Sequence, residues 1–276
     1  MALIDLGESF HFNKTAAYGP KVTDIYPSFL LKFHHMAFVV ISYLLIVRYG
    51  PKLMSGRRPY SLKGIIMVYN LVQVAINGYI VYLTCTRWGI RILGVWKHIC
   101  EPIGGTAGYS ESDELVFVKI IYIYYLTKLL DLLDTVFFIL RKKQSQITFL
   151  HLFHHSSMVV NMWLSMDLIR EQIISVFGLI NVIVHAVMYT YYLLAVLGPS
   201  VRKYLWWKNY ITKMQMAQFV IILSLLAKMR IYNCKSKVLF WPLWSFTVAI
   251  YFILFINFYI NTYKKSNKNV NQKIKI

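Results

Sequence analysis

Residues 172–196 of the chain are QIISVFGLINVIVHAVMYTYYLLAV, a stretch without Lys, Arg, Asp or Glu. A transmembrane helix needs about 20 mostly apolar residues, so this stretch is long enough to cross a bilayer. It nevertheless holds Asn181 and His185, four residues apart and therefore on one helical face, followed by Tyr189 and Tyr192. Polar and ionisable groups are costly inside a membrane and by default indicate function. The stretch therefore predicts a membrane helix that carries part of a site.

The rest of the chain has the same character. Of its 276 residues 58% are hydrophobic, above the roughly 45–50% of soluble domains. The apolar residues gather in seven predicted spans: 29–47, 64–85, 115–139, 147–165, 172–196, 206–227 and 239–262. We therefore expect an all-α polytopic membrane protein with seven transmembrane helices. Its membrane domain covers residues 29–262, between an N-terminal tail of residues 1–28 and a C-terminal tail of residues 263–276, and no soluble domain is expected.

The formal net charge is +19, and the basic residues lie in loops between the apolar stretches. This pattern follows the positive-inside rule, and it also suits a polyanionic substrate or anionic lipid; nucleic acid is not an expected partner. The basic loops 48–63, 140–146 and 197–213 and the tail alternate with nearly neutral segments. We therefore expect a lumenal N-terminus and a cytosolic C-terminus. The basic loop 228–238 disagrees with this orientation and is outweighed by the others.

Two features concern the predicted lumenal side. Cys100 and Cys234 both fall in predicted lumenal loops, where the redox poise permits a disulfide; the alternative is two free thiols. Cys85 lies at a span end and is expected to pack. Asn13 begins the glycosylation sequon Asn13-Lys14-Thr15 in the expected lumenal tail.

Polar groups recur in four of the predicted spans. The predicted orientation places the polar residues of the third, fourth and sixth spans in the cytosolic half of the membrane. Together with Asn181 and His185 of the fifth span, they share one depth. They are Lys128, Asp131 and Asp134 in the third span, His151, His154 and His155 in the fourth, and Thr212, Gln215 and Gln218 in the sixth. The alternatives are a structural ion pair in the third span and interhelical hydrogen bonds in the sixth. Their convergence predicts one intramembrane site open to the cytosol.

Histidine clusters suggest a metal first, and membrane di-iron enzymes also use an H-x-x-H-H box. Such enzymes need several boxes, whereas only four of the eight histidines share this site. A single zinc ion remains an alternative, but no metal is our expectation. Without a metal, histidine acts as a general base or a nucleophile near neutral pH. No cysteine lies in the cluster, so a thioester intermediate on cysteine is not available; a histidine nucleophile that forms an acyl-imidazole is the alternative.

At these residues the chain resembles the ELO family of very-long-chain fatty acid elongases. The resemblance covers nearly the whole length and lies in five ordered motifs. They are Gly50-Pro51-Lys52 with Arg58-Pro59-Tyr60 and Tyr69-Asn70; Lys128 to Thr135 with Phe137-Phe138 and Arg141-Lys142-Lys143; His151–His155; Asn181, His185, Met188-Tyr189, Tyr191 and Tyr192; and Thr212, Gln215 and Gln218-Phe219. One departure is Asp131, where the family usually has Glu. If that carboxylate only supports Lys128 or a histidine, activity should persist; if it contacts substrate with tight geometry, the rate should suffer.

The resemblance implies an acyltransferase of the endoplasmic reticulum membrane, a very-long-chain 3-oxoacyl-CoA synthase, with six helices around an acyl tunnel. It would condense a long acyl-CoA with malonyl-CoA to 3-oxoacyl-CoA, carbon dioxide and CoA, without a cofactor. The expected partners are the 3-oxoacyl-CoA reductase, the 3-hydroxyacyl-CoA dehydratase and the enoyl-CoA reductase of the elongation cycle. A seven-span receptor needs no such histidine cluster, and a transporter would usually show inverted repeats, which the sequence lacks.

Roles for individual residues follow as hypotheses from the resemblance. His154 would be the nucleophile, and His151, His155 and His185 would orient groups or stabilise negative charge. Lys128, Asp131 and Asp134 complete the expected catalytic set. Substrate would be bound by Asn181, Tyr189, Tyr192, Thr212, Gln215 and Gln218 in the membrane, and by Arg141, Lys142, Lys143, Lys203 and Lys208 at the CoA phosphates. Plain topology charge is the alternative for the basic residues.

Overall fold

The computed structural model describes residues 22, 26, 29–98, 100, 111–166, 173–234 and 240–264, and regular structure in these residues is helical throughout. Asn13 and most of both predicted tails lie outside the described residues. The main helices are α2 (Phe33–Leu53), α3 (Lys63–His98), α4 (Glu111–Asp131), α5 (Leu133–Leu140), α6 (Phe149–Leu164), α7 (Ile173–Val196), α9 (Lys208–Ile231) and α10 (Phe240–Tyr259). Shorter turns are η1 (Phe29–Leu31), η2 (Gln144–Gln146), α8 (Pro199–Arg202) and η4 (Ile260–Lys264).

Five helices of the described chain are long and apolar enough to cross a membrane. They are α2, α3 over Lys63–Thr86, α7, α9, and α10 extended to Tyr263. The third and fourth predicted spans correspond to α4 with α5 and to α6. The 16 residues of α6 measure about 24 Å at 1.5 Å per residue, less than the roughly 30 Å of a hydrocarbon core. The structure therefore supports an all-helical, multi-pass membrane protein, and the count of seven spans stays a prediction.

The outer surfaces of the helices suit lipid rather than water. Large apolar side chains such as Phe38 and Leu44 on α2, Leu71 on α3 and Phe246 and Ile253 on α10 are exposed. A soluble monomer rarely exposes extended apolar surface. The interior is filled by fully buried residues that include Tyr125, Val159, Met162, Val182, Tyr189 and Phe240.

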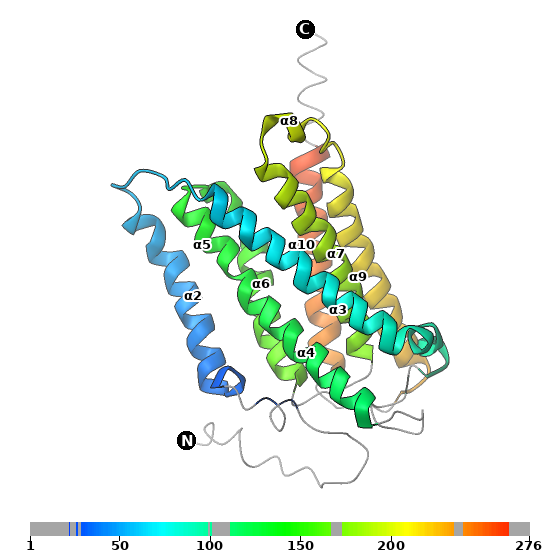
Figure 1. Cartoon of the computed structure of the whole chain (residues 1–276). Coiled ribbons are helices and arrows are strands. Elements are labelled where there is room, and N and C mark those ends of the chain that lie inside the picture. Colours follow the sequence, from blue (N-terminus) through cyan, green and yellow to red (C-terminus); the bar gives the residue numbers. More distant parts are fainter. Residues whose placement is uncertain are drawn as a thin grey trace.

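The helices form a bundle with one peripheral member (Figure 1). Helix α3 packs along α7, α9 packs along α10, and α4 and α10 both contact α6. Helix α2 stands at the edge and contacts α5 and α6. Its close approach to α5 depends on Gly50, where an added Cβ would lie 3.0 Å from Ile139 Cγ2.

The third predicted span, residues 115–139, is interrupted in the structure. Helix α4 ends at Asp131 and α5 begins at Leu133, and the Leu132 N–H bonds to the carbonyl of Leu129 instead of continuing the α-helical pattern. At the end of α5, the Lys142 ammonium donates to the Ser55 carbonyl at 2.9 Å, and the Tyr60 N–H donates to the Leu140 carbonyl at 3.0 Å. The α2–α3 loop is therefore fixed to the end of α5.

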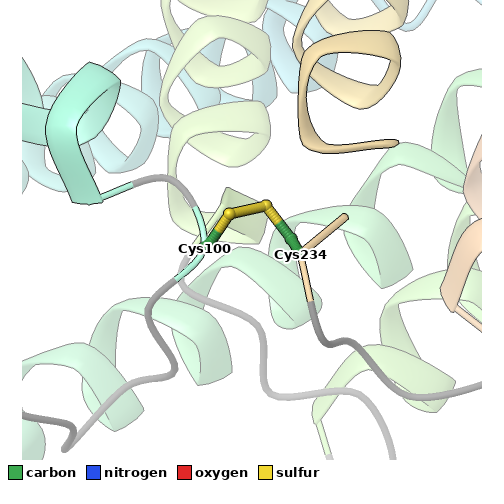
Figure 2. The surroundings of a disulfide bond; sticks show 2 residues. All are labelled: Cys100 and Cys234. Atoms are coloured by element: carbon green, nitrogen blue, oxygen red, sulfur yellow. A yellow bond between two sulfur atoms is a disulfide. The ribbon is translucent and has the colours of Figure 1, made fainter. Parts of the chain in front are cut away.

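The two ends of the bundle differ. The α2–α3 loop, the α5–α6 connection and α8 lie at one end (Figure 1). At the other end, Cys100 follows α3 and Cys234 follows α9, and a disulfide with a Cα–Cα distance of 4.8 Å joins them (Figure 2). These are the two cysteines that the sequence analysis paired. Cys85 is a free, exposed thiol. The disulfide connects positions 134 residues apart, so it ties α3 to α9 at the end of the bundle opposite α8 (Figure 1).

Candidate active site

A buried ion pair stands at the centre of the site. Both Lys128 and Asp131 are 2% exposed, and Lys128 Nζ lies 3.1 Å from Asp131 Oδ2. The other carboxylate oxygen, Oδ1, accepts from Gln73 Nε2 at 2.8 Å and from the Tyr189 hydroxyl at 2.9 Å. His185 Nδ1 lies 3.6 Å from Oδ2. A buried ion pair is tolerated when further hydrogen bonds satisfy its remaining atoms, and Asp131 meets that condition.

The polar network continues from this pair across α4 and α7. Asn181 Oδ1 accepts from Lys128 Nζ at 3.0 Å and from the Tyr124 hydroxyl at 2.7 Å. Lys128 Nζ also lies 4.8 Å from the centre of the Tyr124 ring. The Tyr189 hydroxyl lies 2.8 Å from Asp134 Oδ2 as well as close to Asp131. A hydroxyl has one proton, so Tyr189 donates fully to one carboxyl group at a time and couples the two.

His151 is held by a chain of two hydroxyl groups. Its Nε2 lies 2.7 Å from Thr135 Oγ1, and Thr135 Oγ1 lies 2.9 Å from the Tyr43 hydroxyl. Tyr43 is 3% exposed, and Thr135 is its one hydrogen-bond partner within the described chain. We assign the buried phenol proton to Thr135 and the Thr135 proton to His151 Nε2, because in this direction both buried hydroxyl protons have an acceptor. This direction makes Nε2 an acceptor and keeps the proton of neutral His151 on Nδ1.

The histidines begin α6 together because Thr148 caps that helix, its side chain accepting from the His151 N–H at 3.2 Å. Residues three and four apart then share one face. The rings of His151 and His155 lie 4.2 Å apart and those of His154 and His155 lie 5.6 Å apart, measured between centres. His151 faces Thr135, whereas His154 faces Tyr251 of α10, with ring centres 4.6 Å apart.

His154 also lines an apolar cavity. Four helices supply most of its wall, α6, α7, α9 and α10, and α4 supplies Tyr124. His154 Nδ1 is buried and has no hydrogen-bond partner in the described residues. Of the four clustered histidines, His154 is the one in the cavity wall. It therefore stands between the polar network and an apolar space.

The remaining predicted membrane residues take different positions. Gln218 is buried and lines the cavity. Thr212 is buried, and Gln215 Nε2 lies 3.6 Å from Met188 Sδ. Tyr192 is 39% exposed and packs edge-on against Tyr189. The structure thus joins the predicted residues of α4 to α7 in one cluster, and of those on α9 it brings Gln218 to the cavity.

The predicted basic residues lie outside this cluster, at the end of the bundle that holds α8. Arg141, Lys142 and Lys143 follow α5, whereas Lys203 and Lys208 are exposed and flank the turn between α8 and α9. The Lys142 ammonium donates a hydrogen bond to the Ser55 carbonyl, and Lys203 Nζ lies 4.9 Å from the centre of the Tyr204 ring.

Sequence analysis did not single out several residues of the site. Gln73 binds Asp131, and the spacing of Asn70, Gln73 and Asn77 within an apolar span was a signal for it, because these three polar residues share one helical face. Tyr43, Tyr124 and Tyr251 gave no comparable signal, since tyrosine is common in membrane helices as an apolar or interfacial residue. Ser157 was also not predicted; its hydroxyl lies 2.8 Å from the hydroxyl of Tyr251, a residue of the cavity wall.

A metal site was the alternative for the histidines. Within the described residues, no group of three or more His, Cys, Asp or Glu side chains is placed to hold a metal ion. The histidines instead contact hydroxyl groups, aromatic rings and one another.

Fold and site together define a multi-pass helical membrane protein whose buried polar cluster adjoins an apolar cavity. Residues 28–271 match the family model described as ELO, the GNS1/SUR4 family. The chain is 36% identical over 236 residues to mouse very long chain fatty acid elongase 1, covering 83% of this chain and 81% of the relative. It is 40% identical over 257 residues to rat very long chain fatty acid elongase 5, covering 91% and 81%. The chain belongs to the ELO family, that of the very long chain fatty acid elongases.

Proposed function

We propose that this protein condenses a long-chain acyl-CoA with malonyl-CoA to give 3-oxoacyl-CoA, carbon dioxide and CoA. The observation that carries the proposal is the position of His154, in the wall of an apolar cavity and next to a buried polar network. The apolar lining of the cavity suits a hydrocarbon chain, and the thioester of an acyl-CoA would lie at the histidine. Family membership supports the same reaction class.

In the first step, a ring nitrogen of neutral His154 attacks the thioester carbonyl carbon. The new C–N bond replaces the C–S bond, and the ring proton leaves with the sulfur as the thiol of CoA. The product is a neutral acyl-imidazole. Such a group is sensitive to water, and the apolar cavity excludes water from it.

In the second step, the carboxylate of malonyl-CoA leaves as carbon dioxide, and its bonding electrons stay on the α-carbon. This carbanion attacks the acyl carbon, so that a C–C bond forms and the C–N bond to His154 breaks. The released imidazole nitrogen takes up one proton from the solvent, which restores the neutral ring. No cofactor is consumed in either step.

The residues around His154 orient the reacting groups and stabilise the negative charge that develops on them. Asn181 is held by Lys128 and Tyr124, so its free amide nitrogen is a candidate donor to the developing oxyanion, with Gln215 as a second candidate. Tyr189, Tyr192, Thr212 and Gln218 are candidate contacts of the substrate. His151, His155 and His185 orient His154 and stabilise negative charge.

The basic residues at the α8 end are candidates for the CoA phosphates. The proposal includes seven spans, six of them around the acyl tunnel, in the endoplasmic reticulum membrane. The N-terminus is lumenal and the C-terminus cytosolic in this arrangement. The product would pass to the reductases and the dehydratase of the elongation cycle.

The test uses the full chain in microsomes, with labelled malonyl-CoA and acyl-CoAs of increasing length. Wild type should form labelled 3-oxoacyl-CoA, and H154A should reduce turnover by about a thousandfold or more. The control is H34A, because His34 is exposed on α2, away from the cluster. After incubation with acyl-CoA alone, intact-protein mass spectrometry should find one acyl group on wild type and none on H154A. Normal turnover of folded H154A would exclude the nucleophile.

A further inference from the structure

A second, smaller cavity lies beside the one at His154 and shares part of its wall. It is bounded by Ile80 and Thr84 of α3, by Ile120 and Ile121 of α4, and by α7. Among the described residues, those that bound this cavity include no histidine, lysine or carboxylate. The proposed reaction therefore makes no chemical use of it, and its apolar wall suits a hydrocarbon chain.

The first cavity alone is short. Its wall on α6 runs from His154 through Met158 to Met162, a distance of about 12 Å at 1.5 Å per residue. At its far end Phe177 and Trp244 pack together, with ring centres 5.5 Å apart. An extended long-chain acyl group attached to His154 is longer than this space, so its far end must turn aside or displace the aromatic pair.

The two cavities share four wall residues: Tyr124, Met162, Ile174 and Gly178. The Tyr124 ring is fixed because its hydroxyl binds Asn181. Opposite it, Gly178 has no side chain, and a Cβ there would lie 3.6 Å from Tyr124 Cε1, an ordinary van der Waals contact. The glycine thus leaves space for one methyl group. Met162 is unbranched and adaptable, so it is the member of this wall best able to move aside.

We propose that long acyl chains turn at Gly178 from the first cavity into the second, so that the absent side chain at position 178 sets the upper limit of chain length. The inference rests on the proposed function, since it assigns the path of the substrate's chain. It makes Gly178 and Tyr124 specificity-determining residues, and it leaves the chemistry at His154 unchanged.

The experiment compares wild type, G178A and G178L in microsomes, with a panel of saturated acyl-CoAs from medium to very long chain and labelled malonyl-CoA. Alanine at 178 meets no atom closer than van der Waals contact, and alanine favours a helix over glycine, so G178A should fold. The matched control is G78A on α3, because a Cβ at Gly78 meets nothing within 4 Å. A third arm, W244A, opens the far end of the first cavity.

The expected result is a loss confined to the longest substrates. G178A should lower their kcat/KM relative to short substrates by about tenfold, the effect of one misfitting methyl group in an apolar site, and G178L should lower it further. G78A should match wild type. An unchanged length profile in G178A would overturn the inference, as would an upper limit that moves in W244A alone. If wild type itself forms no product at any length, the proposed function fails instead.

Discussion

The two halves of the site differ in how completely their polar atoms are bonded. Around Asp131, both carboxylate oxygens accept hydrogen bonds, from Lys128, Gln73 and Tyr189, and the buried atom beside them without a hydrogen bond among the described residues is His185 Nδ1, 3.6 Å from Oδ2. On the cavity side, buried His154 Nδ1, Gln218 Oε1 and Trp244 Nε1 have no partner in the described chain. Satisfied buried networks rigidify a structure, and unsatisfied buried groups invite a functional explanation. We infer that the first half is the support and the second half the part that meets substrate.

The largest effect on stability and activity is expected when the Lys128–Asp131 ion pair is broken. D131A leaves Lys128 buried without its counter-charge, which costs about 3–5 kcal/mol of stability. Thermal unfolding in detergent should show a large fall in Tm together with loss of activity. The control is the double variant K128L/D131L, which removes both charges and should regain much of the stability while staying inactive. A double variant that is no more stable than D131A would contradict the role of the ion pair.

Breaking the disulfide should lower stability and leave activity unchanged, whereas D131A should lower both. C100S removes a cross-link between positions 134 residues apart, at an expected cost of about 2–4 kcal/mol. Since the bond lies at the end of the bundle opposite α8 (Figure 1) and outside the polar cluster around Asp131, activity per folded molecule should stay close to that of wild type. Tm and turnover of purified protein measure the two effects, and C85S is the control because Cys85 is free and exposed. Lost turnover in fully folded C100S would show that the disulfide also shapes the site.

The sequence predicted the polar half better than the cavity half. Ionisable residues such as Lys128, Asp131 and His154 stand out in an apolar span because burying them is costly, so their spacing and the loop charges were enough to bring them together. The interruption at Leu132 was missed, since no Pro or Gly marks it. The cavity wall was also not predictable, because Met162, Phe177 and Trp244 look like any other lipid- or core-facing residue until the helices are packed.

Asp131 illustrates what the fold adds to a sequence motif. The sequence left open whether the shorter carboxylate supports Lys128 or contacts substrate. In the structure its two oxygens are occupied by Lys128, Gln73 and Tyr189, the arrangement of a support. Gln73, which sequence analysis passed over, fills the position that makes this arrangement complete.

A smaller effect on activity is expected from removing the hydrogen bond between Thr135 and His151. T135V removes the hydroxyl that donates to His151 Nε2 while keeping the side chain's shape. The ring loses its fixed tautomer and orientation, so kcat should fall about ten- to hundredfold, with KM little changed. Steady-state kinetics test this split, and T135S should restore most of kcat. A rise in KM at constant kcat would assign Thr135 to substrate binding instead.

The smallest effect is expected at the far end of the same relay. Y43F keeps the aromatic ring in place and removes only the proton that Tyr43 gives to Thr135. Thr135 can still donate to His151, so the loss should correspond to one neutral hydrogen bond, about 0.5–1 kcal/mol or two- to fivefold in kcat. Because Tyr43 acts through Thr135, the effects should not add: Y43F/T135V should be no slower than T135V. Full additivity in this double-mutant cycle would mean that Tyr43 acts by packing α2 against the bundle and that the relay does not direct His151.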